Sequence, residues 1–154
     1  MKILLLICVL CLSTISIFAA EFGPQQIVTS SATDVIDAFP ADMDGDGDID
    51  FLAAKPGNFF GGGAAVLYRN NGNGRFTVLS PFTGGPTVLV SNIVASDLDN
   101  DGDLDVVLGS SGTRSGGVRV YRNNGNLRFT RTFDNANAPY LWDIHLGDVN
   151  KDNR

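Results

Sequence analysis

The chain has 154 residues, enough for one ordinary domain, and a formal net charge of −6. Its acidic residues are concentrated in three short loops and its basic residues form no cluster, which argues against a nucleic acid partner. The 18 glycines, and the scarcity of helix-favouring runs after residue 20, predict an all-β fold of short strands and many turns.

Residues 1–20 form a segment of their own. Lys2 is followed by a largely apolar run that ends at Phe18, and then by the small residues Ala19 and Ala20. This is the pattern of a secretory signal peptide, and the segment is too short and wrongly flanked for a membrane span. We therefore expect a secreted protein, in the extracellular space or the periplasm. No stable membrane span should remain once the segment is removed after Ala19 or Ala20.

Both cysteines of the chain, Cys8 and Cys11, lie inside this segment. The mature chain would therefore contain no disulfide bond.

A single predicted strand precedes the first repeat. Phe22 stands before the first acidic loop at nearly the spacing that Phe76 and Phe129 keep before the next two loops. Residues 21–29 are therefore expected to form a strand equivalent to the last strand of a repeat, without the strands that precede it in the complete repeats. If the repeats close into a ring, this strand would complete the last repeat and join the two ends.

An acidic nonapeptide recurs along the chain. It begins at Asp42 and at Asp97, and a third copy begins at Asp148 and is cut short by the chain end. Each copy has oxygen-bearing side chains at loop positions 1, 3 and 5, and the complete copies add glycine at position 6 and a carboxylate at position 9. Calcium takes about six to eight oxygen ligands, and glycine allows the positive φ that folds a loop around an ion. The loops therefore suit calcium.

The alternative is an acidic surface turn without a metal ion. Two carboxylates about 4 Å apart repel each other by about 4 kcal/mol at an effective dielectric constant near 20. Each loop holds several such pairs, so the concentration of charge favours a bound cation. The recurrence of the pattern in similar flanking sequence favours the metal site as well.

The loops differ from an EF-hand. Position 12 is Ala53 in the first loop and Leu108 in the second, where an EF-hand requires an acidic residue. A short apolar run follows position 9 in both complete copies, which is typical of a buried strand. The pattern predicts a calcium loop inside a β-hairpin, closed by the ninth carboxylate as a strand begins.

Each loop belongs to a repeat with four predicted strands. One strand precedes the loop, a second follows it, and a third comes after a glycine-rich connection. The fourth follows an Asn-Gly hairpin tip, a signal of a type I′ turn with positive φ at both central residues. The predicted strands are 35–40, 49–54, 64–69 and 76–80, then 93–96, 104–109, 118–122 and 129–133, and finally 141–146. Four strands in about 50 residues is the size of a β-propeller blade.

The repeats divide the chain into five parts. These are the signal peptide 1–20, the lone fourth strand with its connection 21–34, repeat one 35–90, repeat two 91–140, and the start of a third repeat 141–154. A propeller has about four to eight blades. We therefore expect an incomplete ring of about two and a half repeats of four antiparallel strands, and a sequence that is a fragment of a longer protein.

The repeat resembles the FG-GAP/VCBS repeat of integrin α-subunit propellers and of many exported bacterial proteins. The resemblance is carried by residues 41–52 with the glycine-rich connection that follows, and by 96–109 and 147–152. It covers nearly all of residues 22–154. The sequence departs from the family pattern at Lys55-Pro56 and Ser110-Ser111, and in the third loop at Asn150 and Asn153.

The resemblance implies one Ca²⁺ in the loop of each blade. Position 7 of the loop would supply its backbone carbonyl, and the other ligand positions would supply side chains. The implied ligands are Asp42, Asp44, Asp46, Asp48 and Asp50 for the first ion, Asp97, Asp99, Asp101, Asp103 and Asp105 for the second, and Asp148, Asn150 and Asp152 for the start of the third.

The family also implies a binding or scaffolding module, in adhesion or in the recognition of an extracellular protein or a glycan. The alternative is the propeller part of an exported polysaccharide-degrading enzyme, a lyase or a glycosidase. No residue is assigned a catalytic role. The sole histidine, His145, aligns with apolar residues of the other repeats and is expected to be a packed strand residue. Asp37, Asn92 and Asp143 share one repeat position, for which we expect a structural or channel-lining role.

Overall fold

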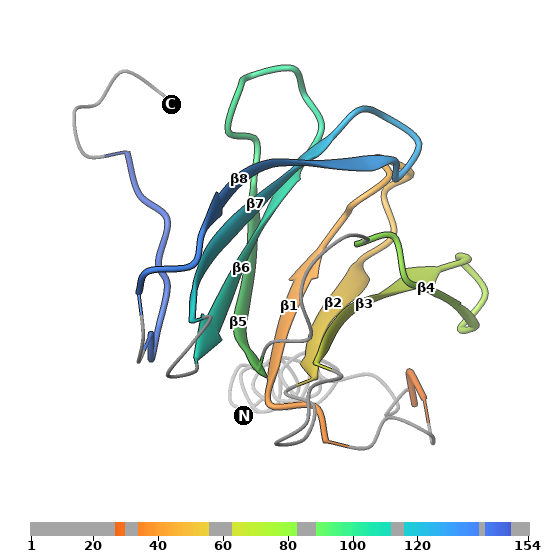
Figure 1. The fold of residues 1–154 in the computed structure, drawn as a ribbon. Helices are drawn as coiled ribbons and strands as arrows, with labels where there is room; N and C mark the ends of the chain where they lie inside the picture. Colours follow the sequence, from red (N-terminus) through yellow and green to blue (C-terminus); the bar gives the residue numbers. More distant parts are fainter. Residues whose placement is uncertain are drawn as a thin grey trace, which may run out of the picture.

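The protein is an all-β molecule, as predicted. The computed structural model describes residues 27–29, 34–55, 63–82, 89–111, 116–138 and 141–148. The strands of these residues form two four-stranded antiparallel sheets, each in sequence order (Figure 1). The first sheet contains β1 (Asp37–Ala41), β2 (Asp50–Lys55), β3 (Ala64–Asn70) and β4 (Phe76–Leu79). The second contains β5 (Leu89–Ser96), β6 (Asp105–Ser111), β7 (Gly117–Asn123) and β8 (Phe129–Asn135).

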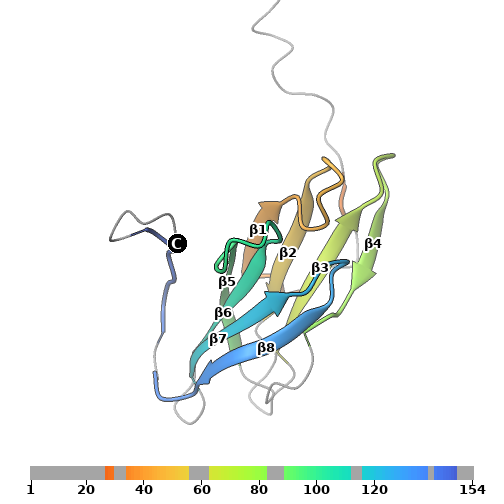
Figure 2. The same ribbon diagram turned by 90° about the horizontal axis from the view of Figure 1, so that it is seen from above.

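The two sheets meet at their first strands. β1 and β5 lie side by side in Figures 1 and 2, whereas β4 and β8 lie at the outer ends. The backbone N–H of Ile93 on β5 donates a hydrogen bond of 2.9 Å to Asp37 Oδ2 on β1. This is the arrangement of two successive propeller blades, with the first strand of each blade innermost. The two blades form an open ring. Within the described residues, no helix is long and apolar enough to cross a membrane.

The main hydrophobic core lies between the two blades. Leu52 and Leu67 from the first sheet are fully buried against Ile93, Val106 and Tyr121 from the second. Burying a large aliphatic or aromatic side chain contributes about 1.5–3 kcal/mol. The alternation of side chains along a strand gives each sheet one face toward the preceding unit and one toward the next.

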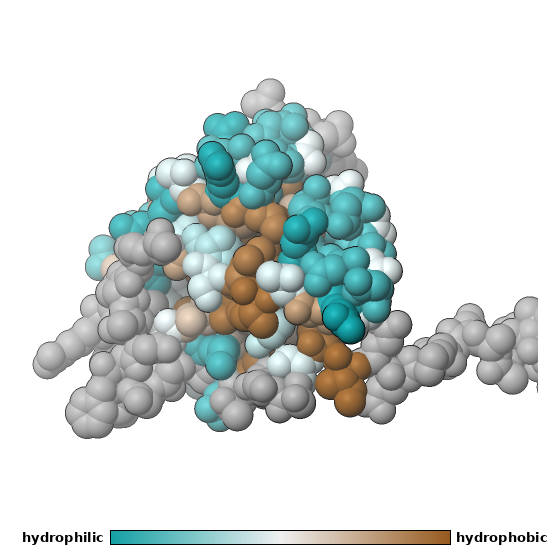
Figure 3. Space-filling model, turned by 90° about the vertical axis from the view of Figure 1, so that its right-hand side faces the viewer, coloured by the Kyte–Doolittle hydropathy of each residue, from teal (hydrophilic) through white to brown (hydrophobic). Residues whose placement is uncertain are grey.

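The outer face of the first blade carries a second cluster. Ala53, Val66 and Tyr68 are buried there, and Val28 packs against them. Residues 27–29 contain no strand, and the rest of the predicted leading strand lies outside the described residues. Figure 3 views the side of the molecule on which β4 lies and shows apolar surface across its middle, bordered by hydrophilic surface.

Residues 141–148 pack against the second blade as β5 packs against the first. Ser91 Oγ donates a hydrogen bond of 3.4 Å to the Leu141 carbonyl. A Cβ added at Gly109 would lie 2.6 Å from Leu141 Cδ2 and 2.8 Å from Ile144 Cδ1, so glycine permits this close approach. The segment was predicted to contain a strand, but residues 141–146 have no strand assignment in the structure.

The predicted type I′ turn occurs in the second blade, but its central residues differ from the expected Asn-Gly pair. Asn126 and Leu127 have φ values of 54° and 57°. The N–H of Arg128 donates a hydrogen bond of 3.2 Å to the Gly125 carbonyl across these two residues. The first blade has Gly74, with φ 73°, where the second has Leu127. A positive φ at leucine costs about 1–2 kcal/mol.

Candidate metal centres

Position 1 of each acidic loop folds the loop back on itself. The Asp42 carboxylate accepts hydrogen bonds from the backbone N–H groups of Gly45, Asp46 and Gly47 at 2.8, 3.1 and 2.9 Å. Asp97 accepts the equivalent bonds from positions 5 and 6 of its loop at 3.2 and 3.0 Å. The position-6 glycines have φ values of 92° and 93°, which confirms the predicted left-handed turn.

Position 9 connects the loop to the third strand of its blade. Asp50 Oδ2 accepts a bond of 3.0 Å from the N–H of Met43, and Oδ1 accepts one of 2.7 Å from the N–H of Asn70. Asp105 accepts the equivalent bonds at 3.0 and 2.9 Å. Both carboxylates are at most 2 % exposed. Burial raises the pKa of both groups above the usual value for aspartate, although the backbone hydrogen bonds act in the opposite direction.

Three carboxylates converge in each loop. Asp42, Asp44 and Asp50 each bring one oxygen within 4.8 Å of the other two, and Asp97, Asp99 and Asp105 do the same. Among the described residues, no group donates a hydrogen bond to the buried Asp44 Oδ1. Leaving a buried acceptor unsatisfied costs about 1–3 kcal/mol, and more for a charged group. Converging carboxylates with an unpartnered buried oxygen fit a hard cation with oxygen ligands.

The position-5 carboxylates do not join these converging groups. Asp101 Oδ1 accepts a 3.0 Å bond from the N–H of position 7, and Asp101 Oδ2 accepts a 3.0 Å bond from Arg122 Nη2. Asp46 Oδ1 accepts the same backbone bond at 2.9 Å, and its Oδ2 lies 3.7 Å from Arg69 Nη2. The backbone N–H of Asp103, and after it the Arg122 guanidinium, hold the pKa of Asp101 below its usual value.

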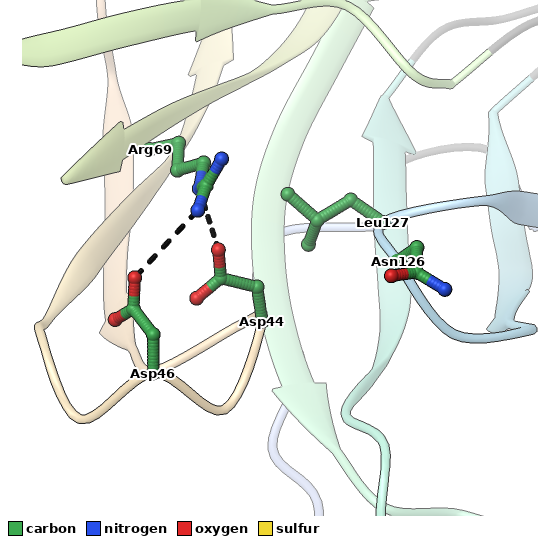
Figure 4. Close-up of a pocket in the computed structure, with 5 residues that line it drawn as sticks. All are labelled: Asp44, Asp46, Arg69, Asn126 and Leu127. Atoms are coloured by element: carbon green, nitrogen blue, oxygen red, sulfur yellow. Dashed lines mark ion pairs between the residues drawn. The ribbon is translucent and has the colours of Figure 1, made fainter. Parts of the chain in front are cut away.

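Arg69 and Arg122 are functional candidates that the sequence analysis missed. They occupy one repeat position at the end of the third strand, in a repeated Tyr-Arg-Asn-Asn-Gly motif that could have indicated them. Arg69 Nε lies 2.5 Å from Asp44 Oδ2, and Arg122 Nε lies 2.7 Å from Asp99 Oδ2. Each guanidinium therefore contacts loop positions 3 and 5 together (Figure 4 shows Arg69).

A cavity of about 310 Å³ separates the first loop from the second blade. Asp44, Asp46 and Arg69 line it from the first blade, and Asn126 and Leu127 line it from the hairpin of the second (Figure 4). The Leu127 side chain points from this hairpin toward the first blade. The first loop is therefore bordered by a neighbouring blade.

The other predicted ligands are less fully described. The carbonyl role of Asp48 and Asp103 stays a prediction. In the third loop only Asp148 lies within the described residues, and Asn150 and Asp152 lie outside them. Metal binding by the third loop therefore also stays a prediction.

His145 is not a packed strand residue, so that expectation is wrong. Its side chain is 87 % exposed, and its Nε2 lies 2.9 Å from Asp143 Oδ2. The reason is the orientation of residues 141–148, in which the neighbouring Ile144 faces the second blade. Asn92 Nδ2 donates a bond of 3.4 Å to Asp143 Oδ1. With the Asp37–Ile93 bond, this gives the shared repeat position a structural role between units.

Two blades, each with an acidic loop between its first and second strands, define a β-propeller-like module. The FG-GAP-like repeat family model matches residues 42–108 and 97–154. The chain therefore belongs to the FG-GAP-like repeat family, as the sequence resemblance predicted. No curated protein and no solved structure matches the chain significantly.

Proposed function

We propose that the protein is an exported, calcium-binding β-propeller module that serves adhesion or scaffolding and binds an extracellular protein or a glycan. The observation that carries the calcium proposal is the convergence of three carboxylate oxygens in each of two loops. The buried, unpartnered Asp44 Oδ1 supports it, because a cation would supply the missing interaction.

The donor set favours calcium over other metal ions. All the candidate ligands are oxygens, which suit calcium or magnesium better than zinc or copper. Magnesium prefers a small octahedral site with retained waters, whereas a loop rich in carboxylates can supply more ligands at longer distances. The expected affinity is that of extracellular modules, about 10⁻⁴ to 10⁻³ M or tighter.

A bound ion would supply two positive charges among carboxylates that otherwise repel one another. Asp42, Asp44 and Asp50 would hold the first ion, and Asp97, Asp99 and Asp105 the second. Because each position-9 carboxylate also binds the N–H of the last residue of the third strand, these residues would connect the ion to the sheet. Calcium should therefore stabilise the blades.

The test is calorimetric titration of the purified protein with calcium and with magnesium, combined with thermal melting in calcium and in chelator. Each site should stabilise the fold by about 2.7 kcal/mol at a hundredfold excess of calcium over Kd. Asp99→Ala should abolish the part of this stabilisation that comes from the second site. Asp34→Asn, which removes an exposed carboxylate outside the loops, should keep the full calcium effect. Absence of calcium binding, or an equal response to magnesium, contradicts the proposal.

Export rests on the signal-like segment 1–20 and has its own test. N-terminal sequencing of the protein recovered from the medium or the periplasm should begin at residue 20 or 21. Recovered protein that begins at Met1 contradicts export by this route.

A further inference from the structure

Each of the two complete acidic loops faces an arginine of its own blade. Arg69 extends from the end of β3 and Arg122 from the end of β7. Arg69 contacts Asp44 and Asp46, and Arg122 contacts the same two loop positions in the second blade. Both arginines lie at the same repeat position, and both make the same pair of contacts. The contact is therefore a property of the repeat.

The guanidinium holds the position-5 carboxylate in place from one side. In the second blade, Asp101 Oδ1 is bound to the N–H of Asp103 and Oδ2 is bound to Arg122. Both oxygens of this carboxylate are thus occupied, and Asp101 is absent from the converging group of Asp97, Asp99 and Asp105. The same division is present in the first blade, with Asp46 apart from the converging group.

We propose that Arg122 and Arg69 are internal competitors for the cation, which hold the position-5 carboxylates away from the ligand cluster and release them when the ion binds. The inference rests on the proposed calcium function and concerns the regulation of the same sites. Calcium needs about six to eight oxygen ligands, so a fourth carboxylate would bind the ion more tightly than three alone. A guanidinium beside a divalent cation is repelled by it, so both cannot hold one carboxylate equally well.

The arrangement has two consequences. In the metal-free protein the guanidinium offsets part of the repulsion among the loop carboxylates, so the blade can fold before the ion binds. When calcium is present, binding must displace that contact, which lowers the affinity of the site. The cavity of about 310 Å³ beside Arg69 gives its side chain space to move away from the loop.

The opposite role would be positioning. An arginine that only orients the outer oxygens of positions 3 and 5 would help the other oxygens to bind the ion. Loss of such a group weakens metal affinity by about tenfold or more. The two roles therefore predict opposite changes in affinity when the arginine is removed.

The experiment compares Arg122→Gln with Arg128→Gln in the purified full chain. Both variants lose one positive charge in the second blade, but Arg128 lies at the hairpin tip, where its backbone bonds to Asn124 and Gly125. Calorimetry with calcium alone should show one site about tenfold tighter in Arg122→Gln. The melting temperature in chelator should be lower than that of the parent. Arg128→Gln should change neither quantity. An unchanged or weaker site in Arg122→Gln overturns the proposal.

Arg122→Lys keeps the charge but loses the planar fork, so it provides a second variant if Arg122→Gln fails to fold. We expect a smaller gain in calcium affinity in this variant, and an unchanged or weaker site again overturns the proposal. Failure of the calcium function has a different signature, in which the parent and both variants bind no calcium. If the parent binds calcium but the variants bind it no more tightly, the competition proposal is refuted while the calcium function stands.

Discussion

The two loops have different surroundings but nearly the same internal structure. Position 2 is the buried Met43 in the first loop and the half-buried Leu98 in the second. Position 4 is Gly45 in the first and Asn100 in the second, and both have positive φ, 74° and 60°. The position-9 carboxylates nevertheless accept the same pair of backbone bonds. The loop shape therefore follows from carboxylate–backbone bonds within the repeat, and the neighbouring blade has little part in it.

The faces of the two blades differ more than their loops do. Val66 lies on the outer face of the first blade, and the equivalent residue of the second blade is Arg119, which is 2 % exposed at the interface between the blades. Arg119 Nη1 donates a bond of 3.0 Å to Ser110 Oγ, and Nε lies 3.2 Å from Asp134 Oδ1. A buried charge is tolerated only with such partners. The blade faces are thus less constrained in sequence than the loops.

The largest expected effect comes from position 9. Asp50→Ala and Asp105→Ala each leave two backbone N–H groups without acceptors, while relieving the cost of a buried carboxylate. We expect a loss of about 3 kcal/mol in the free energy of unfolding for each variant in chelator. Denaturant unfolding measures it.

If the loops are defined by internal bonds alone, the two losses should agree within about 1 kcal/mol. A loss that is much smaller for Asp105→Ala than for Asp50→Ala would show that the hairpin of the second blade, which borders the first loop, adds to the stability of that loop. Asp105→Asn keeps one acceptor oxygen and should lose less than Asp105→Ala.

The next effect tests the difference between Arg119 and Val66. Asp134→Ala removes the carboxylate beside a buried guanidinium, and because Asp134 is partly exposed we expect a loss of about 2 kcal/mol in unfolding free energy. The double variant Arg119→Val/Asp134→Ala, which has valine as in the first blade, should recover to within about 1 kcal/mol of the parent. Chemical denaturation of the parent and both variants gives the comparison. A double variant less stable than Asp134→Ala would show that the arginine itself supports the interface.

The sequence predicted the blades and the loops because both depend on local spacing. Oxygen-bearing residues at alternate positions, glycine at position 6 and a strand after position 9 are all read within one repeat. The partners of Arg69, Arg122 and Arg119 could not be read this way, because each arginine lies on a third strand and its partners lie in the acidic loop or on other strands. The separation of Asp101 from the converging carboxylates follows from its contact with Arg122, and the exposure of His145 follows from how residues 141–148 pack, so neither could be predicted from spacing.

The smallest effect concerns the hairpin tips, where Gly74 in the first blade corresponds to Leu127 in the second. Leu127 has φ 57° and packs partly against the core between the blades. Leu127→Ala loses the packing and keeps the unfavourable backbone conformation, whereas Leu127→Gly loses the packing but relieves the conformation. We therefore expect the glycine variant to be more stable than the alanine variant by about 1 kcal/mol, the reverse of the usual order. Thermal melting of the two variants measures the difference. An alanine variant of equal or greater stability would show that the hairpin of the second blade relaxes out of the left-handed conformation when Leu127 no longer points toward the first blade.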